Sequence, residues 1–329
     1  MSIFITGATG FIGRKLMEKF SGEEPLHLLV RKQSNLTSLE KKNIKFFYGD
    51  VTNKDSVFEG MRGCEKVFHL AAYAKSFSFD KDEYFKINVL GAINVFESAL
   101  KHQVQKLVFT SSCVALGPSQ DKVLTEKDWK ERNHFYTEYE KSKYQAEIEA
   151  EKFVVKGLNL VIVNPTRVYG PGELNESNSV TKIVEKYIKG RFPLILNKGK
   201  EIGNYALVED IALGHILAME KGKAGQRYIL GGENVSLKDF FFILNEILRE
   251  KHWQINIPPK MAKFFAFLEE KKAIFLKKYP VITRSWVDTF LQNWAYSSEK
   301  AEKELGYKYH SLRKGLEITC NWLLNLKRN

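Results

Sequence analysis

Short apolar segments alternate with longer segments of helical spacing through the first half of the chain. The short segments have the length of strands and are rich in Ile, Val, Leu and Phe: residues 2–6, 26–30, 44–48, 66–70, 106–110 and 159–164. Their apolar character is continuous, which is typical of strands that are buried on both faces of a sheet. The segments between them include 92–103 and 136–155, which have the apolar spacing of helices. Strand and helix in turn predict an α/β fold with a doubly wound parallel sheet.

The pattern changes after Pro165. Gly and Pro cluster at residues 170–172, and the chain beyond them is more helical in pattern, more aromatic and more basic. Such a cluster is typical of a loop or a domain boundary. We therefore expect a first domain at residues 1–165 and a smaller, mostly helical lobe formed mainly by 166–329. We also expect the chain to return to the first domain near residues 203–222.

The composition indicates a globular protein. The chain has 329 residues, of which 44% are hydrophobic and 13% aromatic, and this is enough to bury a sizeable core. No segment approaches the ~18 uncharged apolar residues that span a bilayer, and the first residues lack the pattern of a signal peptide. Cys64, Cys113 and Cys320 lie too far apart for a disulfide framework or a metal site. We therefore expect a cytoplasmic protein that is not inserted in a membrane and binds no metal.

The chain is strongly basic, with a net charge of +12. Residues 251–329 hold 15 basic and 7 acidic residues, which gives this last quarter a net charge of +8. An excess of this size favours an anionic partner. Nucleic acid is not expected, because no binding motif accompanies the lysines and they are spread among acidic residues.

The most biased segment is 260–278, where lysines are interspersed with large apolar residues. Met261, Phe264, Phe265 and Leu268 follow helical spacing. The default interpretation is a helix whose apolar side faces the core and whose lysines face water. The alternatives are a lid over a hydrophobic substrate and a peripheral contact with an anionic membrane.

Three glycines directly follow the first predicted strand and open a helical pattern. In this arrangement Gly7 allows a tight turn, Gly10 lets the backbone approach a pyrophosphate, and Gly13 lets the helix pack close to the strand. The amide groups and the positive dipole end of the helix N-terminus attract phosphate. The sequence therefore predicts a dinucleotide-binding turn.

The end of the second predicted strand indicates which dinucleotide binds. Arg31 follows this strand, and no acidic residue occurs before Glu40. An acidic side chain at this place would bind a ribose 2′-hydroxyl, whereas an arginine suits a 2′-phosphate. We therefore expect NADP(H), with NAD(H) as the alternative if Arg31 only faces solvent. Farther along, Asp50 could accept a hydrogen bond from the adenine amino group, with Val51 against the ring.

A candidate for acid–base chemistry lies in the helical segment 136–155. Tyr139 and Lys143 are four residues apart, so that both side chains share one helix face. A cation beside a phenol lowers the pKa of the phenol from ~10, which would let Tyr139 exchange a proton with a substrate alcohol. Ser112 ends a predicted strand and could hold the same substrate oxygen. The alternatives are a surface helix pair for Tyr139 and Lys143 and strand-end capping for Ser112.

Taken together, these residues resemble the extended short-chain dehydrogenases/reductases, the NAD-dependent epimerase/dehydratase family. The motifs occur in family order and cover nearly the whole chain: residues 6–13, 49–51, 69–72, 88–91, 110–112, 139–143, 164–171, 208–210, 227–232 and 300–306. The chain is most similar to the dihydroflavonol-reductase-like and 3β-hydroxysteroid-dehydrogenase-like branch, on residues 29–31, 163–171 and 225–232. The resemblance implies a Rossmann-type fold.

The resemblance also implies roles for individual residues. Tyr139 would be the general acid/base, Lys143 its partner and a ribose ligand, and Ser112 the hydroxyl that orients a carbonyl. The cofactor would contact Gly7, Thr9, Gly10, Phe11, Ile12, Gly13, Arg31, Asp50, Val51, Leu70, Ala71, Ala72, Asn88, Thr110, Tyr139, Lys143, Pro165 and Val168. Asn88 resembles a position that braces the backbone of the site. His69 is most simply a strand-end histidine bonded to the backbone.

The substrate would contact Phe77, Ser112 and Arg167. The aromatic character near Phe77 suggests an apolar or aromatic small-molecule substrate. Arg167 could meet a carboxylate or phosphate of the substrate, or it could pair with an acidic residue such as Glu173.

The sequence therefore predicts an NADP(H)-dependent oxidoreductase that acts on a secondary alcohol or ketone. The alternative is an NAD-dependent sugar or nucleotide-sugar epimerase or dehydratase. A non-catalytic dinucleotide sensor is disfavoured because the chain keeps both Tyr139 and Lys143. The resemblance further implies a homodimer that forms through two long helices, at residues 84–102 and 136–156.

Overall fold

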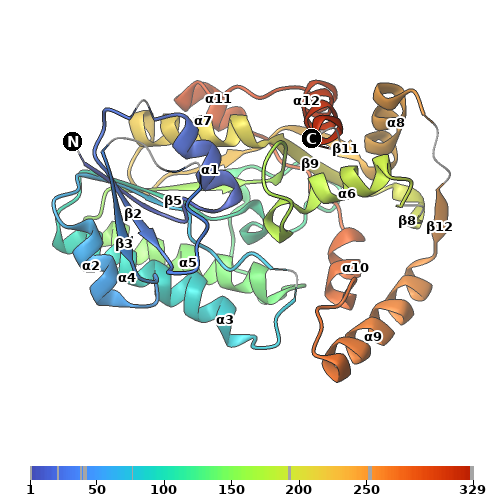
Figure 1. Ribbon diagram of the computed structural model, residues 1–329, viewed down its shortest axis with the longest axis horizontal. Helices are drawn as coiled ribbons and strands as arrows, with labels where there is room; N and C mark the ends of the chain where they lie inside the picture. Colours follow the sequence, from blue (N-terminus) through green and yellow to red (C-terminus); the bar gives the residue numbers. More distant parts are fainter. Residues whose placement is uncertain are drawn as a thin grey trace.

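The computed structural model describes residues 2–20, 22–37, 39, 43–75, 77–191, 194–250 and 254–326. Its centre is a seven-stranded sheet with the strand order β10-β6-β5-β4-β1-β2-β3 (Figure 1). All neighbouring strands in this sheet run parallel. The strands are β1 (Ile3–Thr6), β2 (Leu26–Val30), β3 (Ile44–Tyr48), β4 (Lys66–His69), β5 (Lys106–Thr110), β6 (Leu160–Pro165) and β10 (Arg227–Leu230).

Helices cover both faces of this sheet. On one face lie α1 (Phe11–Glu18), α7 (Val208–Lys221) and α11 (Glu299–Leu305), and on the other α2 (Lys54–Met61), α4 (Gly91–Lys101) and α5 (Glu138–Val155). A short helix, α3 (Asp82–Phe85), and a π-helical turn, η1 (Lys86–Leu90), lead directly into α4. The predicted α/β, Rossmann-type doubly wound sheet is confirmed.

The side-chain period of a strand explains why the sheet is buried on both faces. In β1, Ile3 and Ile5 pack in the hydrophobic cluster beneath α1 and α7, while Phe4 between them packs in the cluster beneath α2 and α4. Successive side chains of a strand point to opposite faces, so that a strand covered on both sides must be apolar at every position. This is the continuous apolar pattern from which the strands were predicted.

A second lobe lies beyond the carboxyl ends of the sheet strands. Its core is formed by aromatic and aliphatic side chains of α6 (Ser179–Ile188), α8 (Leu237–Leu248) and α12 (Leu312–Asn325). Two small sheets belong to this region, one of β7 (Arg167–Tyr169), β9 (Ile202–Leu207) and β11 (Glu233–Ser236), the other of β8 (Leu194–Leu196) and β12 (Ile255–Ile257). The lobe is therefore mainly helical but has its own strands, and β9 leads into α7 on the main sheet.

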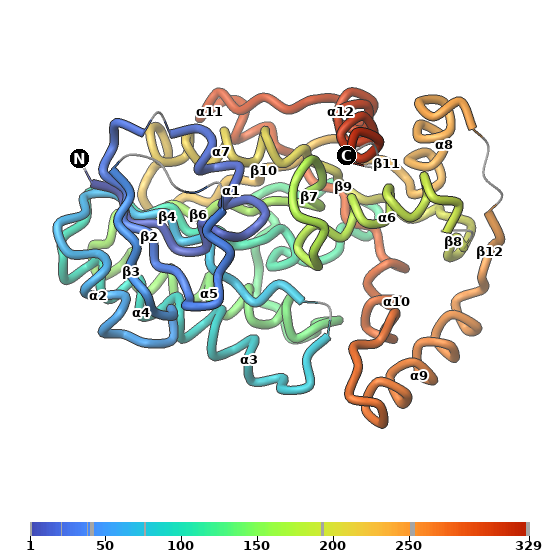
Figure 2. The backbone as a smooth tube through the Cα atoms, viewed as in Figure 1, coloured from blue at the N-terminus to red at the C-terminus, as the bar shows by residue number. Residues whose placement is uncertain are grey.

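Two further helices, α9 (Pro259–Leu276) and α10 (Arg284–Phe290), project from this lobe (Figure 2). They contain the basic, aromatic segment. The expectation that its large apolar residues face the core is wrong, because Phe264 is 59% exposed and Leu268 46% exposed. Ala262, Ala266 and Ala273 are the buried residues of α9 instead.

The described ranges contain no helix long and apolar enough to cross a membrane. Nor do they contain a group of three or more His, Cys, Asp or Glu side chains arranged to hold a metal ion. Cys64, Cys113 and Cys320 are buried free thiols.

Candidate active site

The glycine turn lies between β1 and α1, where β1 is flanked by β2 on one side and β4 on the other. Gly7 has a φ of +76°, and a Cβ at this residue would lie 2.6 Å from the amide nitrogen of Ala71. A Cβ at Gly13 would lie 2.1 Å from the carbonyl oxygen of Gly7. Both residues therefore have to be glycine for α1 to start this close to the sheet.

The N-terminus of α1 suits an anion. Gly10 is its N-cap residue, and no side chain caps the helix. A Cβ at Gly10 would meet only the Gly7 oxygen, at 3.2 Å, so this side of the turn is open to a ligand. The amide groups of the first turn, at Phe11, Ile12 and Gly13, precede the first residue that can bond back into the helix. A dinucleotide pyrophosphate fits this cradle of backbone donors.

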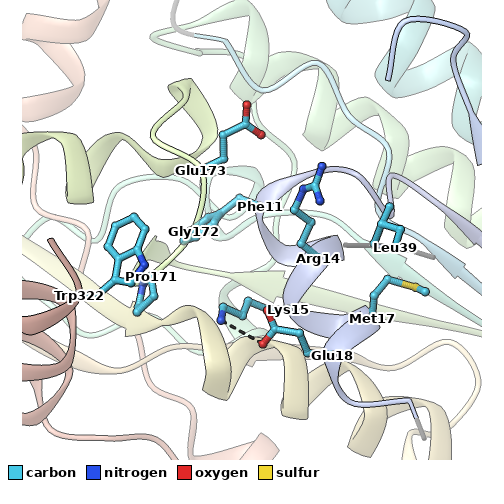
Figure 3. Close-up of a pocket in the computed structure, with 10 residues that line it drawn as sticks. All are labelled: Phe11, Arg14, Lys15, Met17, Glu18, Leu39, Pro171, Gly172, Glu173 and Trp322. Carbon is cyan, nitrogen blue, oxygen red and sulfur yellow. Dashed lines mark hydrogen bonds and ion pairs between the residues drawn. The ribbon is translucent and has the colours of Figure 1, made fainter. Parts of the chain in front are cut away.

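A pocket lies beside α1 (Figure 3). Its lining residues are Phe11, Arg14, Lys15, Met17, Glu18, Leu39, Pro171, Gly172, Glu173 and Trp322. The loop after β7 approaches α1 closely here, because a Cβ at Gly172 would lie 2.8 Å from the ring of Phe11. The pocket is therefore formed by α1 and by a segment of the second lobe.

Arg14 holds the loop that follows β2, and the sequence reasoning missed it. Its guanidinium donates hydrogen bonds to the carbonyl oxygens of Asn35 at 2.7 Å and Thr37 at 2.8 Å. Arg31 begins this loop and is exposed. Within the described ranges it has no ion-pair partner, while Glu40 lies outside those ranges. The position of Arg14 directly after the last glycine of the turn is the signal that could have identified it.

Two further segments line the same edge of the sheet. After β3, Asp50 accepts hydrogen bonds from the amide and the hydroxyl of Thr52 at 3.0 and 2.9 Å. Val51 is buried against Gly91, so that its side chain is part of the core and only its backbone is left to face an adenine. After β4, Leu70, Ala71 and Ala72 are partly exposed and lie beside Gly7.

Asn88 braces the backbone of the site. Its side-chain oxygen accepts a hydrogen bond from the amide of Tyr73 at 2.7 Å, and its side-chain nitrogen donates to the hydroxyl of Ser142 at 2.8 Å. It thus ties the segment after β4 to α5. The same nitrogen lies 3.2 Å from the carbonyl oxygen of Tyr73. The polar atoms of Asn88 are therefore used inside the protein.

Lys143 is buried deeply, with only 2% of its surface exposed. Its ammonium donates a hydrogen bond of 2.9 Å to the carbonyl oxygen of Thr110, the last residue of β5. Burial lowers the pKa of Lys143 to about 8, and the Glu147 carboxylate opposes this effect. The side chain therefore ends at the edge of the sheet where the strands present their carbonyl ends.

Thr110 uses its hydroxyl inside the protein. The hydroxyl lies 2.9 Å from Nε2 of His215 on α7, while Nδ1 of His215 lies 2.7 Å from the carbonyl oxygen of Ile211. Because a carbonyl oxygen only accepts, Nδ1 carries the proton and the Thr110 hydroxyl donates to Nε2. Thr110 thus fixes Lys143 through its backbone and α7 through its side chain.

Tyr139 and Ser112 form the centre of the candidate site. The side chain of Thr137 caps α5 by accepting from the amide of Glu140 at 3.1 Å, which places Tyr139 in the first turn of the helix. The Ser112 hydroxyl lies near the Tyr139 phenol and caps the 3-10 helix after β5. Burial raises the pKa of Tyr139 to about 12, and the nearby Ser112 hydroxyl opposes the rise.

This differs from the low phenol pKa that the spacing of Tyr139 and Lys143 predicts. The ammonium of Lys143 is directed at the carbonyl oxygen of Thr110, and burial dominates at the phenol. Tyr139 is therefore protonated at neutral pH. A protonated phenol beside a hydroxyl is an acid that can donate to a substrate oxygen.

Sequence reasoning also missed a polar cluster beyond Lys143. Glu147, one helical turn farther along α5, is fully buried and accepts a hydrogen bond of 2.6 Å from Asn164. Arg227 of β10 lies 3.2 Å from the other carboxylate oxygen and covers the ring of Trp129 at 4.0 Å. The i, i+4 spacing of Lys143 and Glu147 was the available signal, but their partners come from distant strands.

The remaining predicted residues lie toward the second lobe. Pro165 ends β6, and Val168 packs against the sheet cluster from β7. Arg167 covers the ring of Phe290 at 4.6 Å and lies 3.4 Å from the Tyr205 hydroxyl, so it does not pair with Glu173. A small pocket next to it is lined by Ser112, Cys113, Val114, Thr166, Arg167, Asn204, Thr289, Trp294 and Tyr296. Phe77 lies apart from this pocket, against Phe79 and Tyr279.

His69 is buried at the end of β4. Its Nδ1 lies 2.7 Å from the hydroxyl of Thr6, so its partner is a side chain and not the backbone. Burial, with a contribution from Lys143, lowers the pKa of His69 to about 3, and burial lowers that of His215 to about 4. Both imidazoles are therefore neutral in the folded protein over the usual pH range.

We expect these two histidines to make the fold sensitive to acid. A histidine in the unfolded chain takes up a proton below about pH 6.5. In the folded protein His215 stays neutral down to about pH 4 and His69 down to about pH 3. The resulting contribution to the free energy of unfolding is fully present above pH 6.5. It falls with the pH, by about 2 kcal/mol per histidine at pH 5. Denaturant unfolding of a His69→Gln/His215→Gln variant should show a flatter loss of stability between pH 7 and 5. The exposed His134→Gln control should keep the full loss, and an equal slope in both variants would contradict the assignment.

A profile of the NAD dependent epimerase/dehydratase family matches residues 3–231. The chain belongs to this family. As a member it is an NAD(P)-dependent oxidoreductase of the extended short-chain dehydrogenase/reductase type. The match runs from β1 to the end of β10, so that it includes the glycine turn, Tyr139 and Lys143.

Individual relatives of the epimerase/dehydratase family match over almost the whole chain. A putative dihydroflavonol 4-reductase of a Synechocystis species is 31% identical, over 98% of this chain and 94% of its own length. Sterol demethylase protein B of Methylococcus capsulatus is 25% identical, over 98% of both. The structure of a UDP-glucose 4-epimerase of Thermotoga maritima with UDP-glucose has a TM-score of 0.81 and 22% identity, over 99% of this chain and 100% of that one. The last comparison shows a shared fold.

Proposed function

We propose that this protein is an NADP(H)-dependent oxidoreductase that interconverts a ketone and a secondary alcohol on an apolar or aromatic substrate. The observation that carries the proposal is the Tyr139 phenol near the Ser112 hydroxyl, on the same helix face as the buried Lys143. When bound, the nicotinamide supplies or accepts the hydride. The protein's own task is to hold the substrate oxygen and to move one proton.

Each side chain then has one role. In reduction, Tyr139 donates its phenolic proton to the carbonyl oxygen, and the hydroxyl of Ser112 donates a hydrogen bond to the same oxygen. We assign Lys143, which donates a hydrogen bond to the Thr110 carbonyl, to the ribose hydroxyls of the cofactor. We assign the dinucleotide to residues 1–165 together with the returning segment near 203–222, and the substrate mainly to 166–329.

The pocket beside Ser112 supports the proposed substrate class. Trp294 and Tyr296, both 2% exposed, contribute to its wall, and Arg167 lies at its side. Aromatic walls favour an apolar or aromatic substrate, and Arg167 would meet a polar substituent on it. Two relatives support a small apolar substrate, since one is named as a dihydroflavonol reductase and the other as a sterol demethylase.

The test is turnover of a panel of flavonoid, steroid and simple aromatic ketones with NADPH. The proposal predicts NADPH oxidation with at least one of them. A protein that retains NAD through purification and interconverts nucleotide sugars would be an epimerase or dehydratase instead, which is the alternative that the sequence left open.

Arg31 is the basis for preferring NADP(H). It is exposed directly after β2, where a 2′-phosphate would lie, and the described ranges offer it no acidic partner. We expect Arg31→Ala to lower kcat/KM with NADPH about 10- to 100-fold and to leave kcat/KM with NADH nearly unchanged. Steady-state kinetics with both cofactors measure the ratio of kcat/KM with NADPH to kcat/KM with NADH. Arg62→Ala, at an exposed arginine elsewhere, should leave the ratio unchanged, and an unchanged ratio in Arg31→Ala would contradict the assignment.

A homodimer remains part of the proposal. The continuous helix formed by α3, η1 and α4 packs beside α5, as the two predicted interface helices require. Phe85 and Leu90 of this helix are 44% and 43% exposed, which leaves apolar surface for a second copy.

A further inference from the structure

Helix α9 is attached to the protein by its small residues. Ala262, Ala266 and Ala273 form its buried side, and two of them pack against Val287 of α10 in a small cluster. Alanine side chains let two helices approach closely but bury little apolar surface. The large apolar side chains of α9 therefore lie on the opposite side of the helix.

The outward side of α9 is a stripe of large apolar residues. Met261, Phe264, Leu268 and Phe275 share one face of a helix with 3.6 residues per turn, opposite the alanines. Met261 is 48%, Phe264 59%, Leu268 46% and Phe275 86% exposed. The surface of a soluble monomeric protein seldom presents four such side chains together. Val281, just beyond the helix, is 82% exposed and extends the apolar surface.

The same segment carries an excess of positive charge. The acidic residues of α9 are already paired, Glu269 with Lys272 at 3.1 Å and Glu270 with Arg284 at 2.8 Å. Four other lysines have no ion-pair partner among the described residues: Lys260, Lys271, Lys277 and Lys278. They flank the apolar stripe, so that the exposed surface of α9 is apolar in the middle and positive at its edges.

Tyr279, just beyond α9, contacts aromatic residues of the first domain. The ring of Tyr279 lies 5.3 Å from that of Phe79 and 6.3 Å from that of Phe77, and Lys75 donates a hydrogen bond of 3.3 Å to its hydroxyl. Residues 75–79 follow the Leu70–Ala72 wall of the cofactor site along the chain. Helix α9 is thus linked through Tyr279 to Lys75, Phe77 and Phe79.

We propose that α9 docks on an anionic lipid bilayer, with the Met261–Phe275 stripe in the interface and the flanking lysines at the headgroups. A bilayer fits both properties of the surface, since it accepts irregular apolar side chains without a matching shape and attracts lysines at its anionic headgroups. The helix lies on the membrane and does not cross it, in keeping with its charged flanks. The contact of Tyr279 with Phe77 and Phe79 then puts these two rings close to the bilayer.

The test is flotation of the full chain with vesicles of phosphatidylcholine, with or without phosphatidylglycerol, at physiological salt. We expect binding to the anionic vesicles, weak or no binding to phosphatidylcholine alone, and release by high salt. Phe264→Ser/Phe275→Ser should lower the bound fraction at least about tenfold. Lys271→Glu/Lys277→Glu should do the same through charge, and both variants change exposed side chains, so that the thermal unfolding should be unaltered.

Matched controls are Val155→Ser, an apolar residue that is 89% exposed on α5, and Lys308→Glu, an exposed lysine outside the segment. Both should float like the unmodified chain. Absence of binding to the anionic vesicles, or binding that the α9 variants leave unchanged, overturns the proposal. So does light scattering that shows a dimer dissociated by Phe264→Ser/Phe275→Ser without any vesicle binding, because the occupant would then be a second copy. Vesicle binding is measured without turnover, so its outcome is independent of the proposed reaction.

Discussion

Replacing Tyr139 with Phe should reduce turnover at least about 10³-fold and leave the fold and cofactor binding intact. The variant keeps the aromatic ring and loses only the hydroxyl, which lies near Ser112 and is protonated at neutral pH. The loss removes the proton donor of the reduction, so that it should appear in kcat. Steady-state kinetics, a fluorescence titration with NADPH and thermal unfolding together separate chemistry from binding and stability.

Tyr136 supplies the matched control, because it lies one turn before Tyr139 and is partly buried. Burial and the nearby Glu140 both raise the pKa of Tyr136, and no catalytic role is assigned to it. Tyr136→Phe should therefore turn over substrate at nearly the unmodified rate. If Tyr139→Phe retains more than about a tenth of the activity, the phenol is not the proton donor.

Alanine at Gly13 and at Gly10 should have two different effects, although both residues belong to the same turn. A Cβ at Gly13 would lie 2.1 Å from a backbone oxygen, so that α1 would have to move away from β1. We expect a loss in the free energy of unfolding of about 3 kcal/mol, together with loss of cofactor binding. A Cβ at Gly10 would lie 3.2 Å from the Gly7 oxygen, a tight contact that a small shift relieves, and the φ of −78° suits alanine.

Gly10→Ala should therefore fold normally and bind NADPH at least about tenfold more weakly, because its methyl group occupies the open side of the turn. Denaturant unfolding and NADPH titration of the two variants measure both effects. Normal NADPH affinity in Gly10→Ala would place the pyrophosphate elsewhere. Normal stability in Gly13→Ala would show that α1 can relax away from the sheet.

Most strands of the central sheet could be predicted because their apolar pattern lies within a short stretch of sequence. Strands such as β1 and β5 are apolar at every position since each is covered on both faces, and a short sequence window contains this pattern. The last strand of the sheet, β10, was not predicted as a strand. It pairs with β6 across more than sixty residues of intervening chain, between Pro165 and Arg227. The residues close to β10 in the sequence do not indicate that it pairs with a strand so far away.

The candidate site likewise combines features that can be read from a short sequence window with features that cannot. The relation of Tyr139 to Lys143 is one turn of a helix and can be read from spacing, whereas the partners that fix Lys143 cannot. Thr110 lies 33 residues from Lys143, and its own partner His215 is 105 residues away. The pKa of the phenol also depends on how deeply it is buried, which spacing alone does not contain.

The interpretation of α9 failed for a different physical reason. Large apolar residues at helical spacing indicate a core-facing side only if the neighbouring element has room for them. Here the contact with α10 is made through Ala262 and Ala266, and the aromatic residues remain outside. Hydrophobicity alone therefore did not indicate on which side of α9 the large side chains lie, and the structure leaves them exposed.

The most direct test of the account is the fate of the hydride. A ketone that turns over in the panel should be reduced with NADPH that carries deuterium at both C4 positions of the nicotinamide, and the product analysed by mass spectrometry. The account predicts one deuterium at the carbinol carbon for each NADPH oxidised, and none with Tyr139→Phe. A product without deuterium, or activity that depends only on retained NAD with no net oxidation of NADPH, would contradict it.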